Sequence, residues 1–204
     1  MSYAPAMTDW DARYTDEGWA FGRDPNDFLR EQGDLLPPGR VLCLAEGQGR
    51  NAVWLAQRGH EVTAMDQSAV GLEGARQLAA ERGVTLTTLR ADLDEFEIEP
   101  GAWQGIVSIF AHVDGALRAR VHARVERGLA PGGVFLLEAY RPEQIGRGTG
   151  GPSDDDRMVN LMRLRRELPS LEFLVAREVD REVLEGHRHR GMSSVVQLVA
   201  RRPQ

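Results

Sequence analysis

The stretch Val41-Leu42-Cys43-Leu44-Ala45-Glu46-Gly47-Gln48-Gly49-Arg50-Asn51 decides the fold of this 204-residue chain. Its first four residues are mostly apolar and lead into a glycine turn, a pattern typical of a buried strand. Gly47 and Gly49 keep the turn free of side chains, and a helical pattern begins at Asn51. A strand, a glycine turn and a helix N-terminus in this order predict a nucleotide cradle. In such a cradle, free backbone N–H groups and the helix dipole point at the ligand.

The composition favours a single globular domain that acts on a small molecule. The hydrophobic share of 42% and the charged share of 27% are ordinary for such a domain. The net charge of −6 lacks the basic excess that is usual in nucleic-acid-binding proteins. Residues 1–8 show no signal-peptide pattern, no apolar run reaches the roughly 20 residues of a membrane span, and one cysteine favours a reducing cytoplasm. We therefore expect a cytoplasmic protein without nucleic-acid or membrane partners; its oligomeric state is not readable, although a monomer is favoured.

Strands and helices alternate along the chain. Apolar or β-branched runs predict strands at 40–45, 61–66, 84–89, 106–110 and 134–137. Amphipathic patterns predict helices at 49–58, 68–82, 114–129 and 158–168. Further strands at 171–184 and 194–200, around a turn at 186–191, predict an antiparallel hairpin. We expect a doubly wound α/β fold, with a seven-stranded, mostly parallel sheet that ends in this hairpin.

The chain is expected to form one domain with an N-terminal arm (1–34), a cofactor-binding core (35–140), and a C-terminal helix and hairpin (141–204). The aromatic residues Trp10, Tyr14 and Trp19 can fasten the arm to the domain. Alternatively, the arm closes as a lid over the glycine turn, and Tyr14 reaches the ligand.

Two other segments have readable features. Asp24 and Pro25 predict the N-cap and the first turn of a short helix, with Phe28 and Leu29 facing inward. The glycine-rich and aspartate-rich segment 146–156 predicts a mobile loop.

Two carboxylates follow expected strands. Asp66 ends the second strand, where nucleotide-binding α/β folds hold a ribose diol. It can also cap the helix that follows, and the two roles are compatible. Asp92 ends the third strand and can accept a hydrogen bond from an adenine amino group, with Leu93 against the ring; a solvent-exposed turn aspartate is the alternative.

Five features resemble, in order and spacing, class I S-adenosylmethionine-dependent methyltransferases over roughly residues 35–140: the glycine turn, Asp66, Asp92-Leu93, a fourth strand ending near His112, and Pro131-Gly132-Gly133 before the fifth strand. The two ends of the chain are similar to the small methyltransferases of the tellurite-resistance and thiopurine-methyltransferase-like group. The similar segments are 10–14, 21–22, 25–29 and 185–186, together with His189.

The resemblance implies S-adenosylmethionine as the cofactor and a Rossmann-like methyltransferase fold. The ribose would lie on Asp66, and the adenine near Asp92 and Leu93. The full set of residues expected at the cofactor is Tyr14, Ala45, Glu46, Gly47, Gly49, Asn51, Asp66, Gln67, Asp92, Leu93 and Ser108. Catalysis can rest mainly on positioning, and a base is needed only if the acceptor arrives protonated.

Fewer residues of the sequence indicate where the methyl acceptor binds. His112 follows the fourth strand and is either a base or a hydrogen-bonded structural histidine. Tyr140 and Arg141, at the end of the fifth strand, can shape the acceptor site, and His189 either closes the same pocket or is a simple turn residue. The resemblance suggests a thiol or a chalcogen oxyanion as the acceptor.

Other reactive side chains have simpler interpretations. His187 and His189 lack a carboxylate or thiol at suitable spacing, so no metal site is expected. Cys43 is expected to be a buried packing residue. The arginines of the C-terminal helix and hairpin form a solvated face or, as the alternative, a cluster that attracts an anionic acceptor: Arg163, Arg165, Arg166, Arg188 and Arg190.

The chain departs from the family pattern at three places. Cys43 stands where an acid is usual in the first strand, Ala45 and Glu46 stand where the glycine signature usually has small residues, and Gly105 stands where an acid often precedes the fourth strand. We hypothesise that Glu46 takes over part of the missing acid's work on the methionine ammonium group.

Two other functions fit the same turn. Residues 47–52 match G-x-G-x-x-A, the fingerprint of NAD(P)-dependent oxidoreductases. The Pro-Gly-Gly segment, the hairpin and the aromatic arm favour methyl transfer over this alternative. A non-catalytic S-adenosylmethionine-binding regulator is the other alternative, and the departures at Cys43 and Gly105 keep it open.

Overall fold

The computed structural model describes residues 9–204 and contains one seven-stranded sheet. The strand order is β3-β2-β1-β4-β5-β7-β6, and β7 is antiparallel to both of its neighbours. The strands are β1 (Arg40–Leu44), β2 (Glu61–Asp66), β3 (Thr87–Arg90), β4 (Trp103–Ile109), β5 (Leu129–Tyr140), β6 (Glu172–Glu185) and β7 (His189–Arg201). The predicted doubly wound, mostly parallel fold with a C-terminal hairpin is confirmed.

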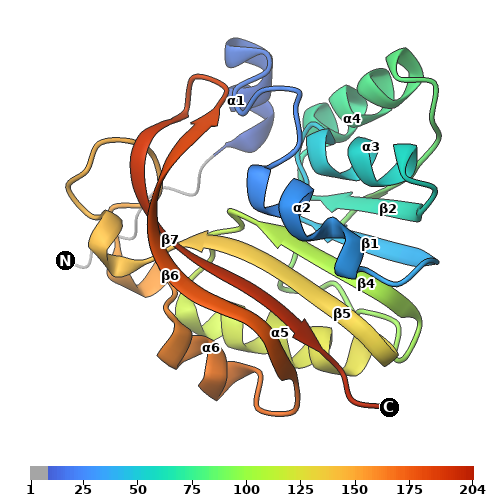
Figure 1. Ribbon diagram of the computed structural model, residues 1–204. Coiled ribbons are helices and arrows are strands. Elements are labelled where there is room, and N and C mark those ends of the chain that lie inside the picture. The colour runs from blue at the N-terminus through green and yellow to red at the C-terminus, as the bar shows by residue number, and fades with distance from the viewer. Residues whose placement is uncertain (1–8) are drawn as a thin grey trace.

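Helices cover both faces of the sheet (Figure 1). They are α1 (Trp10–Glu17), α2 (Asp27–Gln32), α3 (Arg50–Gln57), α4 (Ala69–Glu81), α5 (Gly115–Gly128) and α6 (Leu161–Glu167), with short 3-10 turns at Gly33–Leu35, Pro142–Gln144 and Asp155–Arg157. In Figure 1, α2, α3 and α4 lie on one side of the sheet and α5 and α6 on the other. The long β6–β7 hairpin reaches past the sheet toward α1.

Strand β1 shows how the core is divided between the two faces. Leu42 and Leu44 belong to the apolar cluster that includes α5 and α6, whereas Val41 and Cys43 belong to the cluster that includes α2, α3 and α4. Alternate residues of a strand point to opposite faces, so a strand covered on both sides must be apolar throughout. Cys43 is fully buried, as expected of a packing residue, and burial raises the pKa of its thiol.

The cap of α2 differs from the prediction. Asn26, not Asp24, is the N-cap, because its side-chain oxygen accepts a hydrogen bond from Leu29 N at 2.9 Å. Pro25 therefore precedes the helix instead of lying in its first turn. Phe28 and Leu29 are buried as predicted. Asn26 is fully buried and donates to Glu185 in the hairpin, and this position places the cap one residue after the proline.

Several boundaries are set by long-range pairing that local sequence does not show. Strand β3 begins at residue 87 because residues 87–90 pair with β2. Strand β5 begins at residue 129, so residues 131–133 lie inside it instead of forming a turn before it. Gly105 likewise lies inside β4, paired with β1, and does not precede that strand.

The C-terminal elements also differ from their predicted limits. Helix α6 begins at Leu161 and not at residue 158, because Asn160 caps it and Val159 N donates to Tyr140 O. Residues 172–185 form one long strand, with an irregularity at 173–175. The segment 146–156 is tied to a residue shortly before it, because the Gln144 side chain donates to the Thr149 hydroxyl and to Gly150 O.

Candidate active site

The glycine turn between β1 and α3 is closely packed on two sides. Ala45, Gly47 and Gly49 all have positive φ angles, of 48°, 62° and 85°. A Cβ atom at Gly47 would lie 2.3 Å from Tyr14 Oη, and a Cβ atom at Gly49 would lie 2.6 Å from Ala75 Cβ in α4. Glycine is therefore required at both positions. Tyr14 itself is buried and places α1 directly over the turn.

The N-terminus of α3 is capped by the chain itself. Glu46 Oε1 accepts hydrogen bonds from Asn51 N and Ala52 N, both at 2.8 Å. The prediction that the free N–H groups of this helix point at a ligand is therefore wrong for these two groups. Burial is the main reason that the pKa of Glu46 is raised to about 7.

Asp66 braces the same turn. Its Oδ2 accepts from Gly47 N and its Oδ1 from Ser68 N, each at 2.8 Å, and the side chain is buried. Burial raises its pKa. Ser68 in turn caps α4 by accepting from Gly71 N, as predicted for that residue. Ribose binding by Asp66 stays a prediction.

The other residues expected at the cofactor lie at the ends of β2, β3 and β4. Gln67 and Asp92 are exposed, and Leu93 packs against the core on the α5 side of the sheet. Ser108 is buried within β4. Their contacts with a cofactor also stay predictions.

One cavity of about 320 Å³ connects the glycine turn with the ends of β4 and of the hairpin. Six of the residues expected at the cofactor or at the acceptor lie on its wall: Tyr14, Ala45, Glu46, Asn51, His112 and His189. Residues from the arm, the glycine turn, β4 and the hairpin therefore border the same space.

His112 borders this cavity with a fixed orientation. Its Nδ1 lies 3.2 Å from Arg157 O, and its ring stacks on Tyr140 with centroids 5.3 Å apart and planes 13° apart. Its Nε2 is buried and has no hydrogen-bond partner among residues 9–204. Burial lowers the pKa of His112 to about 4, so the ring is neutral at pH 7.

His189 lies among aromatic rings at the start of β7. Its ring centroid is 4.7 Å from that of Phe21 and 4.8 Å from that of Phe110. Its Nδ1 is 3.7 Å from Glu185 Oε2. Burial lowers the pKa of His189, whereas Glu185 opposes that shift. His189 thus belongs to the cavity wall and is not a simple exposed turn residue.

Neither Tyr140 nor Arg141, which the sequence placed near the acceptor, lines the cavity. The Tyr140 ring is fully buried against Phe110, with centroids 4.5 Å apart. Its Oη has no hydrogen-bond partner in the described part of the chain. Arg141 instead donates to the Ser194 hydroxyl and to Asp180, within the β5–β7–β6 region.

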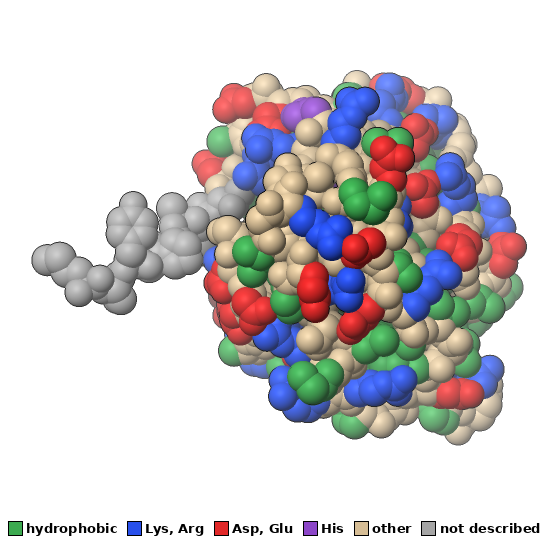
Figure 2. Space-filling view, turned by 60° about the vertical axis from the view of Figure 1, so that its left-hand side comes forward, with side chains coloured by type: hydrophobic (Ala, Val, Ile, Leu, Met, Phe, Trp, Pro, Cys, Tyr) green, Lys and Arg blue, Asp and Glu red, His purple; other side chains and the backbone are tan. Residues whose placement is uncertain are grey.

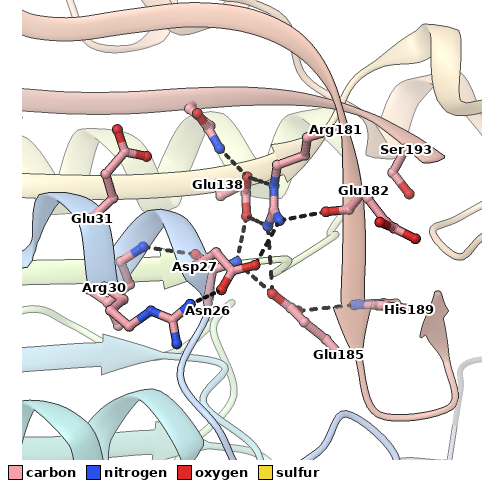
Figure 3. Close-up of polar contacts among 12 residues, drawn as sticks. Asn26, Asp27, Arg30, Glu31, Glu138, Arg181, Glu182, Glu185, His189 and Ser193 are labelled. Atoms are coloured by element: carbon pink, nitrogen blue, oxygen red, sulfur yellow. Dashed lines mark hydrogen bonds and ion pairs between the residues drawn. The ribbon is translucent and has the colours of Figure 1, made fainter. Parts of the chain in front are cut away.

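A buried ionic network joins the arm, α3, β5 and the hairpin, and Figure 3 shows its members Asn26, Glu138, Arg181 and Glu185. Asn26 Nδ2 donates to Glu138 Oε2 at 2.5 Å and to Glu185 Oε1 at 2.7 Å. Arg50, the first residue of α3, donates to Glu185 Oε2 at 2.6 Å. Arg181 donates to both carboxylate oxygens of Glu138, at 2.8 and 2.7 Å. Sequence reasoning missed this network, and the only local signal was an acid, Glu138, inside an apolar strand.

The charges in this network compensate one another. Burial alone would raise the pKa of Glu185, but Arg50 and His189 outweigh it and hold that pKa at about 2. Glu185 is therefore ionised while it is only 5% exposed. A buried charge of this kind is tolerated only when it is paired, so the network fixes the positions of its members.

The tip of the β6–β7 hairpin binds the arm through backbone hydrogen bonds and ion pairs. The N–H groups of His187 and Arg188 both donate to Ala20 O, at 3.2 and 3.3 Å. Glu17, at the end of α1, pairs with the side chains of Arg188 and His187. These contacts are mostly exposed, unlike the buried network below them.

The outer surface shows no segregation of charge on the face in Figure 2. Basic and acidic side chains are intermixed there. On α6, Arg165 and Arg166 are exposed and Arg163 pairs with Asp155.

Within residues 9–204, no three metal-ligating side chains gather into a site. Among the helices described, none has the length and apolar character of a membrane span.

Comparisons with known proteins agree on one domain type. Residues 41–133 match the family model described as a methyltransferase domain. The 2-heptyl-1-hydroxyquinolin-4(1H)-one methyltransferase of Mycobacteroides abscessus is 29% identical over 60% of this chain and 55% of its own length. The demethylmenaquinone methyltransferase of Thermus thermophilus is 32% identical over 62% of this chain and 60% of its own length. The chain thus spans less than two thirds of either relative.

Solved structures confirm the fold. The chain is similar to a protein solved in work on the conversion of a disulfide bond into a thioacetal group during echinomycin biosynthesis, with a TM-score of 0.76, 17% identity, and coverage of 95% of this chain and 90% of that one. It is also similar to TehB from Haemophilus influenzae, with a TM-score of 0.70, 20% identity, and coverage of 86% and 61%. At these identities the likeness concerns the fold alone.

Proposed function

We propose that the protein transfers a methyl group from S-adenosylmethionine to a small-molecule acceptor, because residues 41–133 match a methyltransferase-domain model and the curated relatives are methyltransferases. One observation carries this proposal: a single cavity is bordered by the glycine turn on one side and by His112 and His189 on the other. Its volume of about 320 Å³ lies within the range of roughly 300–1,000 Å³ that is common for small-molecule sites.

The residues around the turn suit the cofactor. Gly47 and Gly49 let Tyr14 and Ala75 pack closely against the turn, and Glu46 adds a carboxylate to the cavity wall. Oε1 of Glu46 caps α3, so Oε2 is the oxygen that we assign to the methionine ammonium group. Tyr14 and Asn51 would border the cofactor, and Asp66 would hold its ribose. When bound, the cofactor supplies a methyl group on a positively charged sulfur.

The rest of the cavity wall would orient the acceptor and exclude water. Phe21 and Phe110 flank His189, so the acceptor end combines aromatic rings with the two histidines and with Arg157 and Arg188. Positioning of two reactants in such a space accounts for much of the rate acceleration in transfer reactions. A reducing cytoplasm suits the unpaired Cys43.

To identify the chemical class of the acceptor, a panel of candidate compounds must be tested. The resemblance to the tellurite-resistance group suggests a thiol or a chalcogen oxyanion, and TehB is one of the structural neighbours. The two curated relatives are named instead for a hydroxyquinolone and for demethylmenaquinone. The panel should therefore contain thiols, tellurite and selenite, and hydroxylated aromatic compounds.

The test is formation of S-adenosylhomocysteine by the full chain with each panel member. We expect product that depends on an acceptor and on S-adenosylmethionine. Tight binding of S-adenosylmethionine without turnover on any acceptor would favour a non-catalytic regulator. Binding of NAD(P) in place of S-adenosylmethionine would favour an oxidoreductase and overturn the proposal.

A further inference from the structure

The charges on the cavity wall are unbalanced. Four arginines line the cavity, Arg13, Arg50, Arg157 and Arg188, whereas Glu46 is the one carboxylate among the described residues that line it. A cleft whose walls carry mainly one sign of charge concentrates ligands of the opposite sign. A bound S-adenosylmethionine would add a positively charged sulfur to the same space. The ligand that shares the cavity with it is therefore expected to be an anion.

Two of the four arginines have carboxylate partners that do not line the cavity. Arg50 donates to Glu185 Oε2 at 2.6 Å, and both side chains are buried. Arg188 pairs with Glu17 at the end of α1. The first pair joins the hairpin to α3 and the second joins it to the arm, so the charges of these two guanidinium groups are already compensated.

A third arginine belongs to the cofactor's side of the cavity. Arg13 lies in α1 next to Tyr14, which packs on the glycine turn. Its guanidinium carbon is 4.8 Å from the centre of the Trp10 ring, in a cation–π contact. A cofactor on the glycine turn would bring the carboxylate of its methionine part to this side. Arg13 therefore has an anion available that does not come from the acceptor.

Arg157 is the arginine without such a partner. Within residues 9–204 its guanidinium forms no ion pair, although three aspartates directly precede it, and Asp155 pairs with Arg163 at 2.6 Å instead. The side chain of Arg157 is half-buried. A cation that is partly removed from water is unfavourable unless an anion pairs with it. A ligand in the cavity is the expected source of that anion.

The backbone around Arg157 is held in place. Arg118, buried in α5, donates to Asp156 O at 2.7 Å and to Met158 O at 3.3 Å. Arg157 O itself lies 3.2 Å from His112 Nδ1. All three contacts use backbone carbonyl oxygens, so they fix the position of the residue and leave its side chain for a ligand. A binding group that is positioned in advance loses less freedom when the ligand arrives.

The other residues of the acceptor end define the kind of anion. The rings of Phe21 and Phe110 line the cavity and suit an apolar or aromatic body better than a small hydrated ion. One guanidinium compensates one negative charge, and its planar fork matches the two oxygens of a carboxylate. A phosphate dianion would need a second unpaired cation, and the other arginines described on the wall have partners of their own.

We propose that the methyl acceptor carries a carboxylate on an apolar body, and that the Arg157 guanidinium binds this carboxylate. This inference rests on the proposed methyl transfer and names the group by which the same cavity selects its acceptor. A neutral molecule of the same shape would leave the cation unpaired. An inorganic oxyanion would leave the phenylalanine rings without a contact.

The test is calorimetric titration of the full chain saturated with S-adenosylhomocysteine, the form of the cofactor that has lost its methyl group. The probes are benzoate, benzamide as a molecule of nearly the same shape without the charge, and selenite as an inorganic oxyanion. We expect benzoate to bind at least about tenfold more tightly than benzamide at neutral pH, because it alone can pair with the guanidinium. Selenite should bind more weakly than benzoate.

Two variants check the assignment to Arg157. Arg157→Gln removes the charge and keeps the backbone carbonyl that contacts His112, so it should bind benzoate and benzamide equally and S-adenosylhomocysteine as the wild type does. Arg157→Lys keeps the charge without the planar fork and should retain part of the preference for benzoate. Arg166→Gln is the matched control, because Arg166 is exposed on α6 and does not line the cavity. This control should keep the full preference.

Three results would overturn the inference: equal affinity of the wild type for benzoate and benzamide, an undiminished preference for benzoate in Arg157→Gln, or tighter binding of selenite than of benzoate. If S-adenosylhomocysteine binds the same sample while any of these is observed, the assignment of the acceptor fails and the proposed function stands. If neither S-adenosylhomocysteine nor S-adenosylmethionine binds the folded wild type, the proposed function itself fails.

Discussion

At the residue scale, the two carboxylate oxygens of Glu46 have different roles. One oxygen caps α3 through Asn51 N and Ala52 N, and the other is proposed to face the methionine ammonium group. Burial raises the pKa of this carboxyl from 4.5 to about 7. Its charge therefore changes near neutral pH, and both tasks can be separated by a substitution that keeps the cap and removes the charge.

Glu46→Gln is the first prediction. A glutamine carbonyl oxygen can still accept from both N–H groups, whereas its side chain cannot pair with an ammonium group. We expect the Kd for S-adenosylmethionine to rise about tenfold at pH 8. Wild-type affinity should also fall as the pH drops through about 7, where Glu46 takes up its proton, while the variant stays flat. Titration calorimetry at several pH values measures both effects, and equal affinity at pH 8 would remove the role assigned to Glu46.

The same pKa shift predicts a stability profile. The folded state binds the Glu46 proton more tightly than the unfolded state, whose pKa is near 4.5. The stabilisation by this group is therefore complete below pH 4.5 and is lost as the pH rises through about 7. Glu46→Gln lacks this titration, so the stability difference between variant and wild type should shift in favour of the variant between pH 5 and pH 8. Urea unfolding across this range measures it, and parallel curves would contradict it.

At the scale of elements, Asn26 connects the arm with the sheet and the hairpin. It caps α2, and it donates to Glu138 in β5 and to Glu185 in β6. Its backbone N–H also donates to Asn51 Oδ1 in α3 at 2.9 Å. Loss of this side chain would leave two buried carboxylates short of a donor.

Asn26→Ala should therefore cost much more than the loss of a helix cap. We expect a decrease of about 3 kcal/mol in the free energy of unfolding, of which about 1 kcal/mol belongs to the cap. Asn160→Ala is the matched control, because Asn160 caps α6 by accepting from Arg163 N at 2.9 Å. That variant should lose about 1 kcal/mol. Similar losses in both variants, measured by urea unfolding, would show that the contacts to Glu138 and Glu185 add little.

At this scale, features with local signals could be predicted from the sequence, whereas contacts between residues far apart in the sequence could not. The glycine turn and Ser68 as a cap could be inferred, since strand ends and caps are local signals, whereas the sequence left the place of His189 open between the pocket and a simple turn. The contact of Asn26 with Glu185 spans 159 residues, and no local pattern announces it. The start of β7 at His189 is likewise set by pairing with Glu185 in β6, and not by the propensity of residues 189–193.

At the scale of the whole molecule, the mostly parallel sheet could be predicted because strands alternate with helices along the chain. The limits of β5 and β6 could not, because they depend on partners such as Trp103 for Leu129. Likewise, the sequence indicated a cradle at the glycine turn, but it could not indicate that the chain itself occupies two of its N–H groups.

The two edges of the sheet predict a monomer. Strand β3 is only 4 residues long, and β6 carries alternating charges, among them Arg177, Glu178, Asp180 and Arg181. Short and charged edge strands disfavour pairing with a second sheet. Light scattering after size exclusion should give the mass of one chain, and a concentration-independent dimer would contradict this expectation.

The central claim is that the cavity beside the glycine turn binds S-adenosylmethionine, and calorimetric titration of Gly47→Ala tests it most directly. A Cβ atom at residue 47 would lie 2.3 Å from Tyr14 Oη at a φ of 62°. Gly59→Ala is the matched control, because Gly59 also has a positive φ, 89°, but nothing lies within 4 Å of an added Cβ atom.

We predict that the wild type and Gly59→Ala bind one S-adenosylmethionine per chain with similar affinity, and that folded Gly47→Ala binds at least about tenfold more weakly. Equal binding by all three proteins would contradict the placement of the cofactor at the glycine turn, and no binding by the wild type would contradict the account as a whole.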